Sequence, residues 1–351
     1  MPKDYVSFLP VDNGDSIIIK AGDNSVLTDI HCRKDDDTFD ITPEIKASCT
    51  NSKLDYFIVT HTDKDHVRGF DEVFYRGAPD KWDKNQLILV KTIVCSQYVI
   101  DLKNPTDIAK PLVNEIRRRN RLEGADRKKD GNKLIIAGDG DLIKVNSNLK
   151  GYVLSPSQGE LDNANPKAEQ DNEANNTSVV IRWEYQQPKG TKTKIMLGGD
   201  SEHEVWHRLD EDKEDSELEW NLITAPHHCS LTPFAYKEGD DDGYTDDEGA
   251  IQALGHRSGK GFVVSSSKPI KRNIDNPPHY KAKNKWIAIL KTGEQDTPEN
   301  RFFCTATHGN NDKAAIVKFE INESGIKRFV KTIASKSTAT AGLNRTTRYG
   351  K

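Results

Sequence analysis

The segment from His61 to His66 carries four side chains that could bind a metal ion within six residues. His61, Asp63, Asp65 and His66 directly follow the β-branched run at residues 57–60, so they fall where a predicted strand ends in a turn. Side chains at such a turn can converge, and imidazole together with carboxylate suits zinc, manganese or iron. A single His-x-Asp motif is more often a solvated polar loop, but four candidate ligands at this density favour a metal site.

Two further polar sites also follow apolar runs. Asp200 comes after residues 195–197 and two glycines, which permit close approach of the backbone. His227 and His228 follow residues 222–225 and a proline in the same way. Each site alone is more often an ordinary turn or a surface histidine, but their recurrence in this order argues against coincidence.

The elements that must position these sites alternate along the chain. Apolar and β-branched runs bounded by turn residues predict strands, with a hairpin signal at Asn13-Gly14. The predicted strands span residues 5–11, 16–20, 25–30, 54–60, 87–95, 133–136, 142–145, 152–154, 178–183, 194–197, 222–225, 262–265, 314–321 and 326–333. Helices are predicted at 105–122, after Ser201 as the N-cap of a capping box with Glu204, and at 280–290. This mixture predicts a layered α/β architecture.

The segments without a predicted strand or helix are expected to be surface loops or a tail that follows a single domain. Residues 158–176 and 237–249 lack any hydrophobic period and are predicted as surface loops. A single domain is expected over residues 1–335, followed by a flexible basic tail at 336–351.

Bulk composition narrows the class of protein. At 351 residues, 34% hydrophobic and 30% charged, the chain can bury a substantial core. No apolar run approaches the roughly 20 residues that cross a bilayer, and the start lacks a signal-peptide pattern, so no membrane and a cytoplasmic location are expected. Five scattered cysteines without a C-x-x-C spacing indicate neither a disulfide framework nor a thiolate site.

The order H-x-D-x-D-H, then G-G-D, then P-H-H resembles the metallo-β-lactamase-like hydrolases. Residues 26–29, a predicted strand that ends in Asp29, match the first motif of that superfamily. The hydrolase domain of the ComEC family of DNA-uptake proteins is the most similar subtype, because His-x-Asp there takes the place of His-x-His. Residues 9–16, 175–180 and 264–265 with Pro278-His279 are similar too. The likeness covers roughly residues 4–320.

The resemblance implies an αββα four-layer sandwich with the site at the open edge of two sheets. Asp65, His66, Asp200 and one of His227 or His228 would hold one ion; His61 and Asp63 would contribute to a second, with Asp200 bridging. One or two ions, Zn²⁺ or Mn²⁺, would activate water for attack on phosphorus or on a carbonyl carbon. Asp65 and Asp200 are therefore candidate catalytic residues.

One departure from the superfamily bears on the number of ions. Between His66 and His203 the sequence has no histidine, so the third-motif ligand normally found in that interval is absent. A single-metal enzyme, a weakly bound second ion and an ion recruited with substrate all remain open.

Several residues are candidates for contact with substrate. Asn176 and Ser178 could hydrogen-bond a phosphate or a metal-bound water, although turn chemistry is as common there. His279 could bind phosphate or protonate a leaving group, with the start of a helix as the alternative. Ser265 ends a predicted strand, and Lys268 belongs to a basic group that flanks the proposed site in sequence.

Basic runs elsewhere, such as residues 117–121, are usually solvated helix faces, but they could also neutralise phosphates.

The resemblance to a domain linked with DNA processing favours a metal-dependent phosphodiesterase, most simply a nuclease acting on DNA or RNA. The alternatives are a hydrolase of a small nucleotide or ester, and a catalytically degenerate regulatory binding module. The expected partner is nucleic acid or another phosphodiester, together with unidentified partner proteins.

Overall fold

The computed structural model describes residues 2–33, 39–164, 172–237, 243–273 and 277–329. The predicted tail at 336–351 lies outside the described residues, as does part of the acidic segment at 237–249. The domain limits at 335 and 336 therefore stay a prediction.

The first sheet has eight strands, in the order β17-β16-β1-β2-β3-β4-β5-β6. They are β1 Tyr5–Phe8, β2 Ile17–Ala21, β3 Asn24–Thr28, β4 Lys53–Ile58, β5 Leu89–Cys95, β6 Lys133–Ile136, β16 Val317–Asn322 and β17 Gly325–Arg328. Strands β3 to β6 are parallel, whereas β1 pairs antiparallel with both β2 and β16. The carboxyl ends of β3 and β4 consequently meet at one edge of this sheet.

The second sheet has seven strands, in the order β15-β14-β11-β10-β9-β8-β7. They are β7 Leu142–Lys144, β8 Leu149–Ser155, β9 Val180–Gln186, β10 Lys192–Leu197, β11 Trp220–Thr224, β14 Arg257–Ser265 and β15 Phe302–Cys304. Strands β10, β11 and β14 are parallel neighbours, so their carboxyl ends also share an edge. A separate pair comprises β12 Ala235–Lys237 and β13 Tyr244–Asp246.

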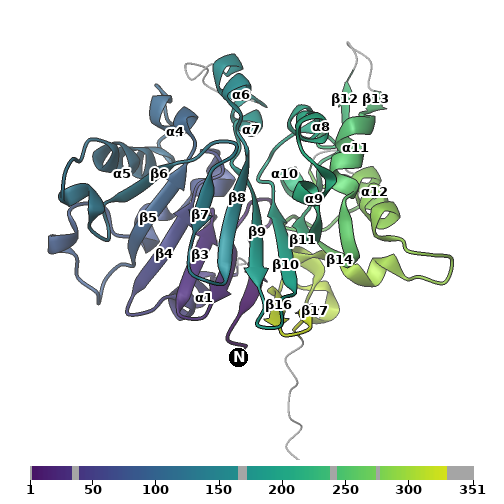
Figure 1. Cartoon of the computed structure of the whole chain (residues 1–351), viewed down its shortest axis with the longest axis horizontal. Helices are drawn as coiled ribbons and strands as arrows, with labels where there is room; N and C mark the ends of the chain where they lie inside the picture. The colour runs from purple at the N-terminus through teal and green to yellow at the C-terminus, as the bar shows by residue number, and fades with distance from the viewer. Residues whose placement is uncertain (1, 34–38, 165–171, 238–242, 274–276, 330–351) are drawn as a thin grey trace, which may run out of the picture.

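Helices lie outside both sheets (Figure 1). Those of the first half are α1 Thr42–Ser48, α2 Lys64–Val67, α3 Phe70–Val73, α4 Gln97–Asp101 and α5 Lys110–Asn120. Those of the second half are α6 Gln158–Asn163, α7 Asn172–Asn176, α8 His203–Asp212, α9 Asp215–Leu218, α10 Pro226–Cys229, α11 Glu248–Gly255 and α12 Tyr280–Leu290. Short 3-10 turns occur at η1 Pro79–Lys81, η2 Asp126–Lys128, η3 Pro298–Arg301, η4 Thr305–Thr307 and η5 Asn310–Asp312.

Three separate apolar clusters show the order of the layers. In β2, Ile18 packs with the helices of the first half, whereas Ile17 and Ile19 pack between the two sheets. In β10, Ile195 and Leu197 point into the same central cluster, while Met196 packs with the helices of the second half. Successive side chains in a strand point to opposite faces of its sheet, so these contacts show that both sheets are buried on two sides. The layers are helix, sheet, sheet, helix, which confirms the predicted αββα four-layer sandwich.

Three local expectations were wrong. Residues 158–176 contain α6 and α7 rather than only a loop, and Ser157 and Glu160 form the capping box of α6. Helix α8 begins at His203 after Glu202, with no side-chain cap from Ser201. In the basic run at 117–121, Arg119 is fully buried, so this face of α5 packs inward. Within the described residues, no helix is long and apolar enough to span a membrane.

Candidate metal centre

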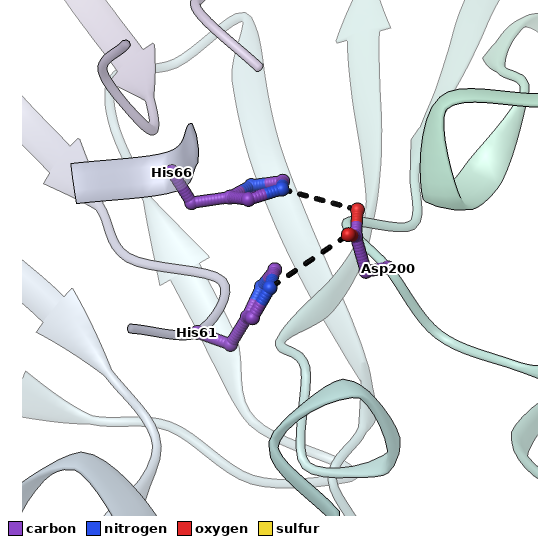
Figure 2. Close-up of side chains that lie close together, drawn as sticks. All are labelled: His61, His66 and Asp200. Atoms are coloured by element: carbon purple, nitrogen blue, oxygen red, sulfur yellow. Dashed lines mark ion pairs between the residues drawn. The ribbon is translucent and has the colours of Figure 1, made fainter. Parts of the chain in front are cut away.

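The predicted ligands come together where the parallel strands of both sheets end. Asp29 follows β3, and the segment from His61 to His66 leaves β4 and enters α2. From the opposite sheet, Asp200 follows β10, and the histidine pair of α10 follows β11. Figure 2 shows His61 and His66 on one side facing Asp200 on the other. All seven predicted ligands thus lie in one cluster that joins the two sheets.

One half of the cluster surrounds the Nε2 atom of His66. It lies 3.1 Å from Asp200 Oδ1 and 3.2 Å from His228 Nε2. His228 Nε2 is in turn 3.3 Å from Asp65 Oδ2 and 3.3 Å from Asp200 Oδ2. The ligand atoms of Asp65, His66 and His228 all lie within 4.8 Å of one another. These four residues place two imidazoles and two carboxylates close together. His66 also groups with His61 and Asp200, whose ligand atoms lie within 4.8 Å of one another, so His66 stands between the two halves of the cluster.

The other half surrounds His61. Its Nε2 atom is 3.8 Å from Asp63 Oδ2 and 3.8 Å from Asp200 Oδ2. This nitrogen is buried and has no hydrogen-bond partner among the described residues. A buried polar atom without a partner costs about 1–3 kcal/mol, and a bound cation would satisfy it. Together with the imidazole and carboxylate donors, this fits a bound metal ion.

The four histidines are held at Nδ1 by outer atoms, so each presents Nε2 to the cluster. His66 Nδ1 contacts Asp29 Oδ2 at 2.7 Å, and His61 Nδ1 contacts Thr60 Oγ1 at 3.1 Å. The Nδ1 atom of His228 lies 3.1 Å from the carbonyl oxygen of Ser266, and that of His227 lies 3.3 Å from Glu202 Oε1. His228 Nδ1 also accepts from the N–H of Gly14 at 3.1 Å. Outer partners of this kind fix the orientation of the ring in metal sites.

The backbone around the cluster adopts conformations that side chains ordinarily avoid. Asp29 has φ 54°, and His227, His228 and Cys229 have φ values of 48°, 52° and 64°. Gly199 is also left-handed, and a Cβ on it would lie 2.8 Å from the Cβ of Thr60. The loop after β10 can therefore approach the loop after β4 only with glycine here. Strain of this kind, concentrated at one place, is characteristic of functional sites.

Burial and mutual charge shape the protonation of the cluster. Burial lowers the pKa of His61 to about 4, so its imidazole is neutral at pH 7 and offers a lone pair. Asp63 has 49% of its side chain exposed, but desolvation on the side that faces the cluster, together with the charge of Asp200, raises the pKa of Asp63 to about 6. Burial opposes the charged form of His66, but Asp200 and Asp29 outweigh it and raise the pKa of His66. A bound cation would offset the repulsion between these carboxylates.

Other predicted site residues lie around the cluster or apart from it. Asn176 donates to Glu204 and lines a separate cavity of about 490 Å³. Ser178 is buried, with an Oγ that has no hydrogen-bond partner among the described residues. Ser265 Oγ lies 2.6 Å from Ser267 Oγ. His279 is the N-cap of α12, where its Nδ1 accepts from the N–H of Lys281. The catalytic role of His279 and the substrate contacts of these residues stay predictions.

Several residues of the centre were not in the predicted ligand set. Asp29 had a motif match but no assigned role, although it holds His66 and also accepts from the N–H of Thr60 at 2.9 Å. Asp15 lies within 4.8 Å of Asp29 and His66, and burial raises its pKa to about 6. Glu202, which contacts His227, stands two residues after Asp200, and this proximity in sequence was the available signal.

A basic pocket opens beside the centre, with a volume of about 390 Å³. Asp65 lines it and so belongs both to this pocket and to the ligand cluster. The pocket is also lined by Asp12, Asn13, His31, Arg33, Lys64, Arg68 and Lys268. It thus carries four cationic side chains against two carboxylates, since burial lowers the pKa of His31 to about 4. The structure places Lys268 at this pocket, beside the predicted ligands.

Comparison with known proteins shows that the fold of this chain is similar to folds in solved structures. No model of a known protein family matches the sequence, and no curated protein matches it. Among solved structures, the chain is similar to the metallo-β-lactamase fold protein YhfI from Bacillus subtilis, with TM-score 0.42 and 11% identity over 89% of this chain and 98% of that chain. It is similar to the metallo-β-lactamase GOB-18 from Elizabethkingia meningoseptica, with TM-score 0.34 and 14% identity over 72% and 91%. CmlA, a diiron β-hydroxylase from Streptomyces venezuelae, has TM-score 0.34 and 12% identity over 64% and 34%. At these identities the likeness concerns the fold alone.

Proposed function

We propose that this protein is a metal-dependent phosphodiesterase, most simply a nuclease acting on DNA or RNA. The observation that carries the proposal is the basic pocket that shares Asp65 with the ligand cluster. A phosphodiester placed there would have its charge neutralised next to the reacting centre. The motif likeness to the ComEC hydrolase domain supports nucleic acid as the substrate class.

The residues of the centre divide into two roles. Asp65, His66, Asp200 and His228 would hold a metal ion, with His61 and Asp63 available for a second. When bound, zinc or manganese lowers the pKa of a water ligand and polarises a phosphoryl oxygen. Asp29 and Glu202 orient His66 and His227 through their Nδ1 atoms.

The basic pocket would hold the flanking phosphates. Lys64 and Lys268 are exposed, and neither has a hydrogen-bonded or ion-paired side-chain partner among the described residues. Lys268 is placed through its backbone, whose N–H donates to Asn13 Oδ1 at 3.0 Å. Arg33 is already paired with Asp12, which fixes its guanidinium at the wall of the pocket. Free ammonium groups beside a fixed guanidinium suit a chain of phosphates.

The first experiment measures bound metal and cleavage of single- and double-stranded nucleic acid with added Mn²⁺ or Zn²⁺. We expect at least one ion per chain and cleavage that Asp200→Ala abolishes. Cleavage of carboxyl esters with no effect on any phosphodiester would contradict the proposal. Cleavage confined to a small nucleotide would replace the nuclease with the alternative small-molecule hydrolase. A folded chain with well under one ion would instead favour the regulatory binding module.

The basic pocket gives a second and independent test. The double variant Lys64→Ala with Lys268→Ala should keep its metal content but raise KM, because phosphate contacts outside the ligand cluster are lost. Each lost contact should also reduce the slope of log affinity against log salt by about one. Lys110→Ala, at an exposed ion pair on α5, is the matched control and should leave KM and slope unchanged. An unchanged slope in the double variant would exclude this pocket from substrate binding.

A further inference from the structure

We infer that His227 supplies the metal ligand that the sequence lacks between His66 and His203, so that the two adjacent histidines serve two different metal positions. The inference rests on the metal dependence proposed above and concerns how many ions the chain holds. It assigns Asp65, His66 and His228 to one position and His61, Asp63 and His227 to the other. Asp200 lies between them and faces both.

The need for another donor arises on the His61 side of the cluster. His61 and Asp63 face Asp200 from the loop after β4, and no histidine at residues 67–202 can join them. His61, Asp63 and Asp200 give this side three protein donors, which together with a water is the ligand set of a catalytic zinc, and a fourth protein donor would close it. A further imidazole from the opposite sheet would complete the set.

The distances show that the Nε2 atoms of His227 and His228 have different neighbours. His228 Nε2 lies 3.3 Å from Asp65 Oδ2 and 3.2 Å from His66 Nε2, so it belongs with those residues. His227 Nε2 lies 3.8 Å from Asp200 Oδ2, the same oxygen that lies 3.8 Å from His61 Nε2. His227 and His61 therefore face one carboxylate oxygen at equal distance, and His228 lies nearer to the same oxygen, at 3.3 Å.

The backbone explains how two consecutive side chains can both face the centre. Successive side chains point to opposite faces in a strand and diverge around a helix. Here His227, His228 and Cys229 are all left-handed, and the two rings lie 6.1 Å apart at an angle of 76°. A run of three such non-glycine residues is unfavourable for the backbone and persists only where the surrounding structure holds it. Placement of one imidazole alone would not require both histidines to adopt this conformation.

Contacts to the Nδ1 atom of His227 orient its ring in the way that metal-binding histidines are oriented. Its Nδ1 lies 3.3 Å from Glu202 Oε1 and 3.1 Å from Thr232 Oγ1, which leaves Nε2 toward Asp200. Glu202 is itself buried and accepts from Asn175 Nδ2 at 3.4 Å. The N–H of His227 donates to the carbonyl oxygen of Gly199 at 3.0 Å, which ties the pair to the Asp200 loop. A carboxylate behind a histidine is the arrangement that orients metal ligands in proteins.

The test counts ions in the intact chain by plasma mass spectrometry and by calorimetric titration with Zn²⁺ and with Mn²⁺. The unmodified chain should bind two ions. His227→Ala should lose one ion and keep the other with unchanged affinity, and His228→Ala should lose the complementary one. Glu202→Gln should weaken only the position that His227 serves, by about 10–100-fold. His207→Ala, on the exposed face of α8, is the matched control and should keep both ions.

Thermal unfolding checks that each variant is folded, and His227→Gln replaces His227→Ala if the alanine variant is not. Two ions of unchanged affinity in a folded His227 variant would overturn the inference. A single ion in the unmodified chain would also overturn it while leaving the phosphodiesterase proposal intact. Absence of any ion would remove both.

Discussion

At the residue scale, Asp29 connects the end of β3 to two parts of the centre. It is fully buried, accepts from the N–H of Thr60 and contacts the Nδ1 atom of His66 at 2.7 Å. Asp29→Asn keeps the shape but removes the charge that fixes the His66 tautomer. We expect metal affinity to fall by about 10–100-fold with little change in secondary structure. Zinc titration measures this, with Asp71→Asn at an exposed position as control. Equal affinities in both variants would show that Asp29 acts only on folding.

Residue spacing predicted which side chains lie together at the centre, but it did not predict their supporting contacts; the role of these side chains as metal ligands stays a prediction. His61, Asp65 and Asp200 were predictable because each follows an apolar strand, and parallel strands place such positions at one edge. Asn176 shows the limit, since the same strand-entry logic applied to it but its side chain donates to Glu204. Which way a side chain turns after a strand depends on tertiary partners. These tertiary partners cannot be predicted from the spacing of residues in the sequence.

At the scale of elements, helix α5 is anchored to the first sheet by a buried ion pair. Arg119 is 0% and Glu115 is 3% exposed, and the Nε of Arg119 donates to Glu115 Oε1 at 2.8 Å. The same guanidinium donates to the carbonyl oxygens of Lys133 in β6 and Val90 in β5. Glu115→Ala would leave this cation buried and unpaired.

We expect Glu115→Ala to lower the free energy of unfolding by about 3–5 kcal/mol, because breaking a buried pair leaves an uncompensated charge. Denaturant unfolding followed by circular dichroism measures the change. Asp107→Ala removes an exposed partner of Lys110 on the approach to the same helix and should give no measurable change. A loss below about 1 kcal/mol for Glu115→Ala would mean that Arg119 finds water or another acceptor.

Strands were more predictable than helix ends. Each of β2, β4 and β10 contains consecutive apolar residues, such as Ile195–Leu197 in β10, as expected for strands packed on two sides, and the structure confirms these strands. The start of α8 was placed wrongly because Ser201 and Glu204 have capping-box spacing but the chain turns one residue later, at Glu202. Cap geometry depends on the local backbone path, here set by the approach of Gly199 to Thr60.

At the scale of the whole molecule, the candidate ligands belong to both sheets. Asp65 and His66 follow the first sheet, and Asp200 and His228 follow the second. A bound ion would thus stabilise the packing of one sheet on the other, in addition to its local contacts. Ligand at about 100 times its Kd adds roughly 2.7 kcal/mol to the stability of a folded chain.

Removal of metal with a chelator should therefore lower the unfolding midpoint of the entire chain by several degrees, and addition of Zn²⁺ or Mn²⁺ should restore it. Differential scanning calorimetry with metal analysis of the same sample measures both. Asp200→Ala is the control, because its midpoint should not respond to the chelator. An equal response in both proteins would indicate an effect of the chelator unrelated to the centre.

The order of strands in the first sheet has a consequence for synthesis on the ribosome. Strand β1, made first, lies between β2 and β16, and β16 is made only after residue 317. Until then β1 has one open hydrogen-bonding edge, although β2 can pair with it at once. A prematurely terminated product that stops before β16 would carry this edge permanently, and exposed edges of apolar strands seed aggregation. A product that lacks β16 would therefore be recognisable to chaperones and proteases by the unpaired edge of β1.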